Sequence, residues 1–482
     1  MKPKSEEKNK RATNHPTPHH WQEMNRKQRR ELTRQMQSGD LRLEVVHPDA
    51  AGIDIGNESH YVAVPPSRAN QSVRQFGCTT AELKAMAAWL LQCRIRTVAM
   101  QSTGVYWIAV YDILEAAGLE VYLVNARDTK NLPGRKSDVQ ESQWLMKLHT
   151  YGLLRNSFRP SQEIRKMRTY WRQRNDLVQS AGRYIQRIQK VLTQMNIQLA
   201  NVLSDVSGVT GQAIIKAILA GERNPHKLAE LRDRRVRASK AEIASYLEGH
   251  WQEDLLFVMK QEQEGYEFCQ QQIAACDQQL EQYLQQREDR SQGASLPEET
   301  RKGRLRKEKK GKPQFDLRAE LFRMSGTDLT RIDGLDVRTA TTILSEAGSD
   351  MNKWPDEHHF VSWLRLCPDN RISGDKVIGK GRLPTNNRAS IALKMAASTL
   401  RASNSYLGAQ FRRLRSKLGA PIAIKAMAAK LARLVYRMLR YGMQFVDRGA
   451  DFYNTQHRKL QIAHLKSKAA GLGFRIVEAT AA

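Results

Sequence analysis

The sequence predicts an α/β domain with a mixed sheet, then a long helical coiled-coil segment and a mainly helical C-terminal domain. Short β-type and helix-type runs alternate between residues 43 and 157. Apolar residues then recur at helical spacing from 158 to 286, as in helices that pack on one another. After a basic stretch that is almost free of aliphatic residues, helical periodicity returns between 322 and 450. The length of 482 residues agrees with several domains.

The composition favours a nucleic-acid partner. Lys and Arg number 78 against 50 Asp and Glu, which gives a net charge of +28. An excess of this size attracts polyanions, with an anionic membrane surface as the alternative partner. No apolar run reaches the roughly 18 residues of a transmembrane helix, and the basic N-terminus lacks the apolar core of a secretory signal. The five cysteines are scattered, which indicates free thiols in a reducing compartment.

The first domain is expected to follow a basic arm over residues 1–42, which either touches phosphates or only aids solubility. Four β-type runs come next, and we expect strands at LRLEVV, AGIDIG, HYVAVP and SVRQFG. Downstream we expect a helix at AELKAMAAWLLQC, a strand at TVAM, a helix over 104–118, a strand at LEVYLV and a helix over 137–151.

The connections between these elements predict the sheet. Strands that follow one another directly can pair as an antiparallel meander, whereas strands separated by crossover helices become parallel. The order of elements over residues 43–157 is therefore typical of a ribonuclease H-like nuclease domain with a mixed sheet.

Polar side chains fall at strand and helix ends of this domain. Asp54 lies within IDIG, where a strand disfavours an unpaired carboxylate, and Gln101 follows TVAM. Asp138 and Glu141 share one side of the first turn of the last helix. A hard divalent cation would explain carboxylates from separate elements, and two such ions can clamp a phosphodiester. The alternatives are a turn Asp at a strand end, and acids that only complement the helix dipole behind a Ser137 N-cap.

The residues from 158 to 205 are expected to form one long helix with an apolar face and a cationic remainder. The cations favour contact with RNA or DNA, and an ordinary solvated face is the alternative. They are Arg165, Lys166, Arg168, Arg172, Arg174, Arg183, Arg187 and Lys190. After shorter helices over 209–248, a seam of apolar residues between 255 and 283 predicts either an intramolecular hairpin against this long helix or dimerisation.

The last third begins with a basic linker over residues 287–321. The run LTRIDGLDVRTATTILSEAG then has the pattern of a helix-hairpin-helix-like element, in which a turn at Gly334 opens a helix whose amides can meet a phosphate. The usual second glycine is Asp336 here, and a plain helical turn is the alternative. We expect a basic tail over 451–482.

A candidate nucleophile lies between two helical stretches of the last domain. Ser373 stands next to Gly374 in an expected polar loop, ahead of a basic and Asn-rich cluster. The cluster comprises Lys376, Lys380, Arg382, Asn386, Asn387 and Arg388. From the residues alone, such a serine is either a nucleophile or an ordinary turn residue.

Several segments resemble the DEDD-type insertion-sequence transposases of the IS110/IS1111 family. For the N-terminal domain they are AGIDIG, MQSTGVYW and VNARDTKNLPGRKSDVQESQWLMKLHTYGLLR. The segment from about 334 to 442 is similar to the C-terminal transposase domain of that family, including its Ser-Gly motif before a basic loop. The resemblance implies a RuvC-like nuclease domain over 43–157 and a serine-bearing transposase domain over 322–450.

The resemblance also implies a set of site residues. The four acidic positions of the family fall on Asp54, Gln101, Asp138 and Glu141, and its serine nucleophile falls on Ser373. Two positions depart from the family pattern. Gln101 replaces a Glu and offers an oxygen without a charge, and Glu141 replaces the usual Asp with a longer side chain.

The function that the resemblance implies is a transposase that cuts and rejoins DNA to move an insertion sequence, through Ser373 and a Mg²⁺ site. It further implies guidance by a non-coding (bridge) RNA, a homodimer or tetramer, no membrane, and a bacterial, cytoplasmic, nucleoid-associated location. Two alternatives stay open. With Gln101 the chain could be a catalytically impaired DNA- or RNA-binding protein, or it could be a hydrolytic Holliday-junction-type nuclease that needs no serine.

Overall fold

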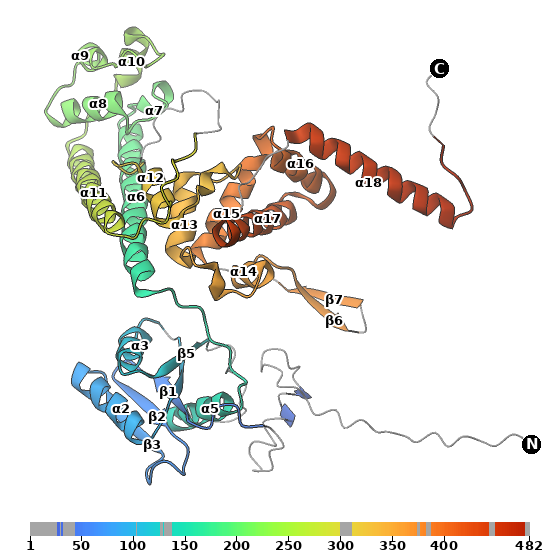
Figure 1. Ribbon diagram of the computed structural model, residues 1–482. Helices are drawn as coiled ribbons and strands as arrows, with labels where there is room; N and C mark the ends of the chain where they lie inside the picture. The colour runs from blue at the N-terminus through green and yellow to red at the C-terminus, as the bar shows by residue number, and fades with distance from the viewer. Residues whose placement is uncertain are drawn as a thin grey trace, which may run out of the picture. The chain divides into compact units, whose positions relative to one another are not determined.

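The computed structural model (Figure 1) describes residues 27–28, 30–31, 44–102, 104–125, 129, 137–298, 311–373, 376–381, 387–442 and 449–477. The chain divides into two compact units, residues 1–159 and residues 160–482. The expected N-terminal arm lies almost wholly outside the described residues, and so does the most basic part of the expected linker.

Unit 1 is built on a five-stranded mixed sheet with the strand order β3-β2-β1-β4-β5. The strands are β1 (Ala50–Ile55), β2 (Ser59–Ala63), β3 (Val73–Gly77), β4 (Thr97–Gln101) and β5 (Glu120–Val124). The first three form an antiparallel meander, whereas β4 lies parallel to β1 and β5 lies parallel to β4. The prediction of a meander followed by parallel strands is therefore confirmed.

The predicted strand at LRLEVV is wrong. The described residues of this run, 44–46, lie outside the sheet. The backbone amides of Val46 and His47 both donate to the carbonyl of Thr150, at a nitrogen–oxygen distance of 2.9 Å in each case. The side chains of Val45 and Val46 are 50% and 44% exposed. Within the described part of the run, the amide of Val46 bonds to the end of a helix rather than to a neighbouring strand.

Helices cover both faces of the sheet (Figure 1). They are α2 (Thr80–Gln92), α3 (Trp107–Ala116) and α5 (Asp138–Thr150). Ile53 of β1 packs in one cluster with Leu90 of α2 and Val110 of α3. Ala99 of β4 packs in a second cluster with Leu148 of α5. Because side chains alternate between the faces of a strand, the two clusters separate α5 from the other two helices.

Unit 2 begins with a hairpin of two long helices, α6 (Gln162–Gln194) and α11 (Glu253–Gln285). The ion pairs Arg174–Asp277 and Arg187–Glu262 join them and fix an antiparallel course. Of the two alternatives for the apolar seam, the intramolecular hairpin is confirmed. The guanidinium of Arg174 is fully buried, and its Nη2 also donates to the carbonyl of Gly311 at 3.0 Å.

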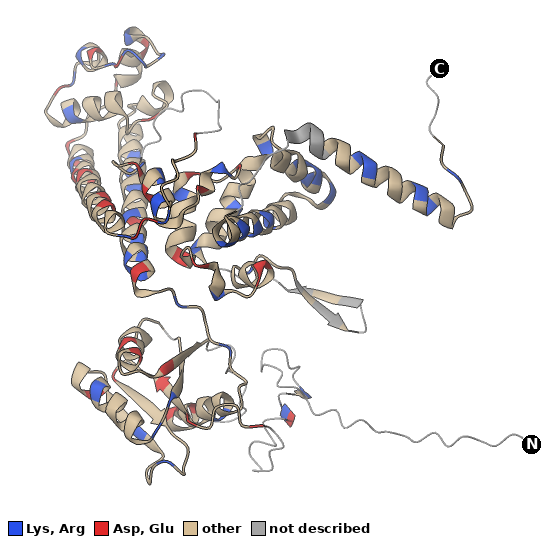
Figure 2. Ribbon diagram, in the orientation of Figure 1, with Lys and Arg blue, Asp and Glu red and all other residues tan. Residues whose placement is uncertain are grey.

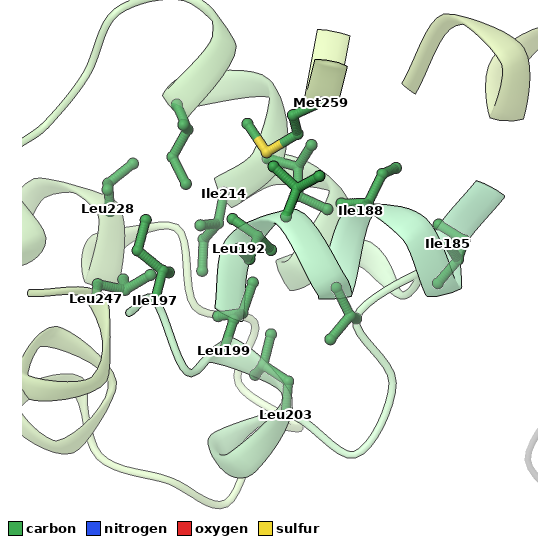
Figure 3. Packing of buried hydrophobic residues seen from close by; sticks show 14 of the residues in the cluster. Ile185, Ile188, Leu192, Ile197, Leu199, Leu203, Ile214, Leu228, Leu247 and Met259 are labelled. Carbon is green, nitrogen blue, oxygen red and sulfur yellow. The ribbon is translucent and has the colours of Figure 1, made fainter. Parts of the chain in front are cut away.

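Four short helices connect the end of α6 to the start of α11 and share a core with them (Figure 3). They are α7 (Leu199–Val202), α8 (Val209–Leu219), α9 (Pro225–Glu230) and α10 (Lys240–Leu247). The prediction of one helix from 158 to 205 is wrong at its C-terminal end. The chain turns at Asn196, which has a φ of +57°, a conformation that Asn tolerates better than most residues. The turn lets Ile197 and Leu199 join the core.

The rest of unit 2 is mainly helical, with one small hairpin of strands. Its elements are α12 (Leu317–Ser325), η2 (Leu329–Arg331), α13 (Val337–Ala347), η3 (Met351–Lys353), α14 (Glu357–Trp363), β6 (Asp369–Ser373), β7 (Lys376–Gly381), α15 (Arg388–Thr399), η4 (Leu400–Ala402), α16 (Tyr406–Leu418), α17 (Ala420–Tyr441) and α18 (Gly449–Gly471). Regular structure resumes at Leu317, slightly before the predicted position. Most of the predicted tail is the helix α18.

Candidate active site

Two of the predicted site residues lie on neighbouring parallel strands. Ile53 of β1 pairs with Met100 of β4, so Asp54 and Gln101 are the next residues of the same register. Both stand at the carboxyl ends of their strands. Gln101 is 9% exposed and Asp54 is half-buried. Carboxyl ends of adjacent parallel strands are where open α/β sheets gather functional groups.

Both residues point to the face of the sheet that α5 covers. A Cβ atom added to Gly52 would collide with the backbone of α5 at Ser142 and Met146. Asp54 is two residues farther along β1 and therefore lies on the same face. On β4 the same argument runs from Ala99, which packs with α5, to Gln101. The contact at Gly52 is between two backbones, so it sets the height of α5 above the sheet.

The direction of α5 brings its first turn to the same end of the sheet. The imidazole Nε2 of His149, in the last turn of α5, lies 2.8 Å from the Oγ1 of Thr97, at the start of β4. The middle of α5 lies over Gly52. The helix thus runs antiparallel to β1 and β4, and its N-terminus faces the strand ends that carry Asp54 and Gln101.

Measured from Gly52, the site residues of β1 and those of α5 lie at similar distances along their elements. A strand rises about 3.3 Å per residue, so Asp54 lies about 6.6 Å beyond Gly52. A helix rises about 1.5 Å per residue, so Glu141 and Asp138 lie about 4 to 9 Å beyond the part of α5 that covers Gly52. Sequence reasoning expected the first strand and the last helix to converge but missed the part that Gly52 plays in it. The available signal was a glycine inside a strand pattern, which indicates close approach of another backbone.

The environment of His149 is unusual for a titratable group. Its ring lies 4.7 Å from the ring of His47 and 4.6 Å from that of Tyr122, measured between centroids. Burial, and secondly the neighbouring His47, lower the pKa of His149 to about 3. The imidazole is therefore neutral at ordinary pH, and it acts as a polar anchor between α5 and β4.

The start of α5 is capped without using the acidic side chains. Ser137 accepts a hydrogen bond from the amide of Gln140, and the Gln140 side chain accepts one from the amide of Ser137. The predicted Ser137 N-cap is confirmed. Asp138 is exposed and Glu141 is half-buried in the first turn, where the helix dipole favours their charge.

The donor chemistry of these four residues fits a hard divalent cation. Asp54, Asp138 and Glu141 supply carboxylate oxygens, and Gln101 supplies an amide oxygen, which are the ligands that Mg²⁺ prefers. Within the described ranges, however, no three His, Cys, Asp or Glu side chains converge closely enough to hold a metal ion. Convergence on an ion would require rotation of the longer side chains at the start of α5.

Ser373 belongs to unit 2, and the expectation of a polar loop around it is corrected. It is the last residue of β6, which pairs antiparallel with β7, and Ser373 stands opposite Lys376. Its side chain is exposed. Gly374 lies outside the described residues, and so do Arg382 and Asn386. A two-stranded ribbon therefore carries the serine at its tip, between α14 and α15 (Figure 1).

Comparison with known families gives matches to both halves of the chain. Residues 51–197 match a family described as Transposase, DEDD_Tnp_IS110. Residues 326–412 match the Transposase IS116/IS110/IS902 family. The chain belongs to the IS110 family of DEDD-type transposases. A comparison with curated proteins finds no match.

The two matched segments contain all the predicted site residues of this IS110-family transposase. The first spans Asp54, Gln101, Asp138 and Glu141 and continues through α6. The second spans Ser373. The transposase is accordingly an enzyme of DNA transposition. No helix in the described part of the chain is both long and apolar enough to cross a membrane.

The predicted hairpin before α13 offers little to a phosphate. Asp336 is the N-cap of α13, and its carboxylate accepts hydrogen bonds from the amide and the hydroxyl of Thr339. A carboxylate at this position competes with any phosphate for the helix N-terminus. Gly334, with a φ of +93°, packs close to Leu400. These contacts favour a plain helical turn over a phosphate-binding hairpin.

Much of the predicted cationic face of α6 is used inside the transposase. Arg168 and Arg172 both pair with Glu346 of α13, whose carboxylate is 8% exposed. Arg174 pairs with Asp277 in the hairpin core. Trp171 donates to the hydroxyl of Thr342 on α13 at 3.0 Å. These cations join α6 to its neighbours, so they are poor candidates for nucleic-acid contact. Lys166, Arg183 and Lys190 are exposed.

Proposed function

We propose that this transposase cuts and rejoins DNA through a covalent link between Ser373 and the DNA backbone. In this reaction the Oγ of Ser373 forms a bond to phosphorus, and the bond from phosphorus to one deoxyribose oxygen breaks. The released deoxyribose hydroxyl carries a proton in place of the one that the serine loses. The reverse reaction with a different strand rejoins the DNA without a high-energy cofactor, because the phosphodiester energy is conserved.

The observation that carries the proposal is the antiparallel course of α5 over β1 and β4. It aligns the first turn of the helix with the strand ends of Asp54 and Gln101, which is the arrangement that a metal-dependent phosphodiester site needs. Asp54, Asp138 and Glu141, with the amide oxygen of Gln101, would hold Mg²⁺. When bound, the ion would neutralise phosphate charge.

The exposed tip position of Ser373 supports its role as the attacking group. A hydroxyl on an exposed short ribbon can reach the phosphodiester backbone of a DNA substrate, whereas a buried serine could not. The acids belong to unit 1 and the serine to unit 2. In the proposed dimer or tetramer, one active site can therefore combine the acids of one subunit with the serine of another.

The proposal includes guidance by an element-encoded non-coding RNA. The net charge of +28 supports a polyanionic partner in addition to DNA, although charge alone is sequence-independent. The exposed cations Lys166, Arg183 and Lys190 of α6 are the members of the predicted RNA-contact face that internal ion pairs leave available.

The test is capture of the covalent intermediate. The full-length transposase, co-expressed with its own element, is incubated with labelled element DNA and Mg²⁺, denatured, and resolved by electrophoresis. We expect a protein–DNA adduct that disappears with Ser373→Ala and persists with Ser416→Ala, which removes an exposed hydroxyl on α16. Sequencing of the RNA that co-purifies tests the guide, because a transcript from the flank of the element is expected.

Two outcomes would contradict the proposal. Cleavage that survives Ser373→Ala would favour a hydrolytic nuclease. A protein that binds element DNA but forms no adduct, and whose behaviour does not change with Asp54→Asn, would favour a binding protein in which Gln101 has replaced an essential acid.

A further inference from the structure

A long stretch of unit 2 contains cations but no acids. Between Lys376 and Val446 there are 15 Lys and Arg residues and no Asp or Glu. The described residues of this stretch form β7, α15, η4, α16 and α17. Figure 2 shows Lys and Arg along α16 and α17 without any acidic residue on either helix. Surfaces that only need to be soluble usually mix both signs, so the uniform charge calls for an anionic partner.

On one side of this stretch the fold itself supplies the counterions. Arg437 of α17 makes a bidentate pair with Glu357 of α14, and Arg433 lies within ion-pair distance of the same carboxylate. At the start of α15, Arg388 pairs with Asp176 of α6 at 3.4 Å. Arg437 and Arg388 are therefore already paired with carboxylates of neighbouring helices.

The cations at the seam between α15 and α17 are in a different environment. Lys394 of α15 and Lys425 of α17 are both half-buried and repel each other. Burial, and secondly the charge of Lys425, lower the pKa of Lys394. Neither lysine makes an ion pair with a carboxylate of the described residues. Two like charges held together without a counterion are destabilising, and an anion that contacts both would relieve the repulsion.

Exposed apolar side chains lie on the same two helices as this lysine pair. Ile391 and Met395 of α15 are 47% and 65% exposed, and Ile422 of α17 is 55% exposed. Ile391 and Ile422 each lie one helical turn before one of the lysines, on the same side of its helix. We call Lys394, Lys425 and these three apolar residues the lysine seam. Its chemistry combines two point charges with apolar contact area.

We propose that the lysine seam binds the phosphodiester backbone of duplex DNA. Lysine contacts phosphate as a point charge and does not read base edges, so the seam holds DNA without selecting its sequence. The apolar members favour DNA over RNA, because they can contact the C2′ methylene of deoxyribose without burying a hydroxyl. The inference rests on the assignment to DNA transposition and adds the surface on which the duplex lies. The seam begins on the helix that directly follows the ribbon of Ser373.

The test is the salt dependence of DNA binding. Each phosphate contact that a protein makes contributes about 0.9 to the slope of log K against log salt concentration. Lys394→Gln and Lys425→Gln should each reduce the slope by about 0.9, and the double variant by about 1.8, on duplexes of any sequence. Binding is measured by fluorescence anisotropy with the full-length Ser373→Ala protein in EDTA, so failure of the proposed chemistry does not affect the result.

Two control variants distinguish the loss of a phosphate contact from a general effect of substitution on the protein. Lys216→Gln removes a lysine that already pairs with Glu267 at 2.9 Å, and it should leave the slope unchanged. Lys394→Arg keeps the charge and should preserve the slope within experimental error. An unchanged slope in the double variant would overturn the proposal. A reduced slope with a structured RNA but not with duplex DNA would also overturn it and would assign the seam to RNA.

Discussion

Of the four proposed metal ligands, Gln101 is the one without a charge. It sits at the end of β4, beside the strand end of Asp54, and is almost completely buried. An amide oxygen there can ligate a cation but brings no charge to balance it. In the buried position of Gln101 the missing charge matters more than it would on the surface, because screening by water is weaker.

Gln101→Glu is therefore expected to strengthen Mg²⁺ binding. The added carboxylate should lower the Mg²⁺ concentration for half-maximal adduct formation by at least about tenfold. The measurement is a Mg²⁺ titration of adduct yield. Gln92→Glu, which adds the same charge at the end of α2, is the matched control and should not shift the midpoint. A midpoint that is equal in both variants would remove Gln101 from the set of ligands.

Residue types alone located the candidate positions but could not fix how they meet. Asp54 was identifiable because a carboxylate is out of place in a strand, and Ser137 because it has the chemistry of an N-cap. The anchor between His149 and Thr97 was not predictable, since its partners are 52 residues apart and neither belongs to a motif. Sequence spacing carries no information about such a contact.

At the scale of elements, the position of α5 depends on Gly52. The Cβ of any other residue would collide with the backbone of α5 at Ser142 and Met146. Backbone atoms cannot rotate out of the way as side chains do, so the helix would have to shift as a whole. The first turn of α5 would move with it, away from the strand ends of β1 and β4.

Gly52→Ala is expected to destabilise unit 1 by about 1 to 3 kcal/mol and to abolish adduct formation in the protein that still folds. Thermal unfolding and adduct yield are the two measurements. Gly182→Ala is the control, because a Cβ at this helical glycine of α6 would meet nothing within 4 Å. It should stabilise the protein by about 0.5 to 1 kcal/mol. Unchanged adduct yield in Gly52→Ala would show that α5 does not position the site.

The elements themselves were largely predictable, and each of the three errors has a physical reason. LRLEVV has the composition of a strand, but the amide of its last residue, Val46, bonds to Thr150 at the end of α5. The long helix predicted to end at residue 205 ends at 194, because the turn at Asn196 allows Ile197 to enter the core. The loop predicted around Ser373 is a ribbon, since the pairing of β6 with β7 depends on both strands together. In the first two cases a contact distant in sequence outweighed the local pattern, whereas the ribbon joins residues that are close together in the chain.

At the scale of the whole molecule, the proposed site residues come from both units. This has a consequence for assemblies that contain two different variants. Asp54 belongs to unit 1 and Ser373 to unit 2. If different subunits supply these two groups to one site, a subunit with Ser373→Ala can still provide its acids. A subunit with Asp54→Asn can still provide its serine.

Mixed assemblies of these two variants are therefore expected to recover adduct formation, although each variant alone is inactive. With random mixing of equal amounts, about a quarter of the composite sites receive both intact groups, because each group comes intact from half of the subunits. The readout is adduct yield after co-expression. Wild-type protein mixed with the double variant is the reference. No recovery in a confirmed mixed assembly would mean that each site is built within one subunit.

The backbone contact between β1 and α5 also bears on how such an enzyme can change. Because no side chain separates the helix from the strand at Gly52, the spacing between them cannot be adjusted by small substitutions in a packed layer. In the proposed metal site, preference and reactivity would change through exchange of the ligand side chains, on a frame of constant dimensions. A designer who wishes to retune the proposed catalyst would begin with Gln101 and Glu141.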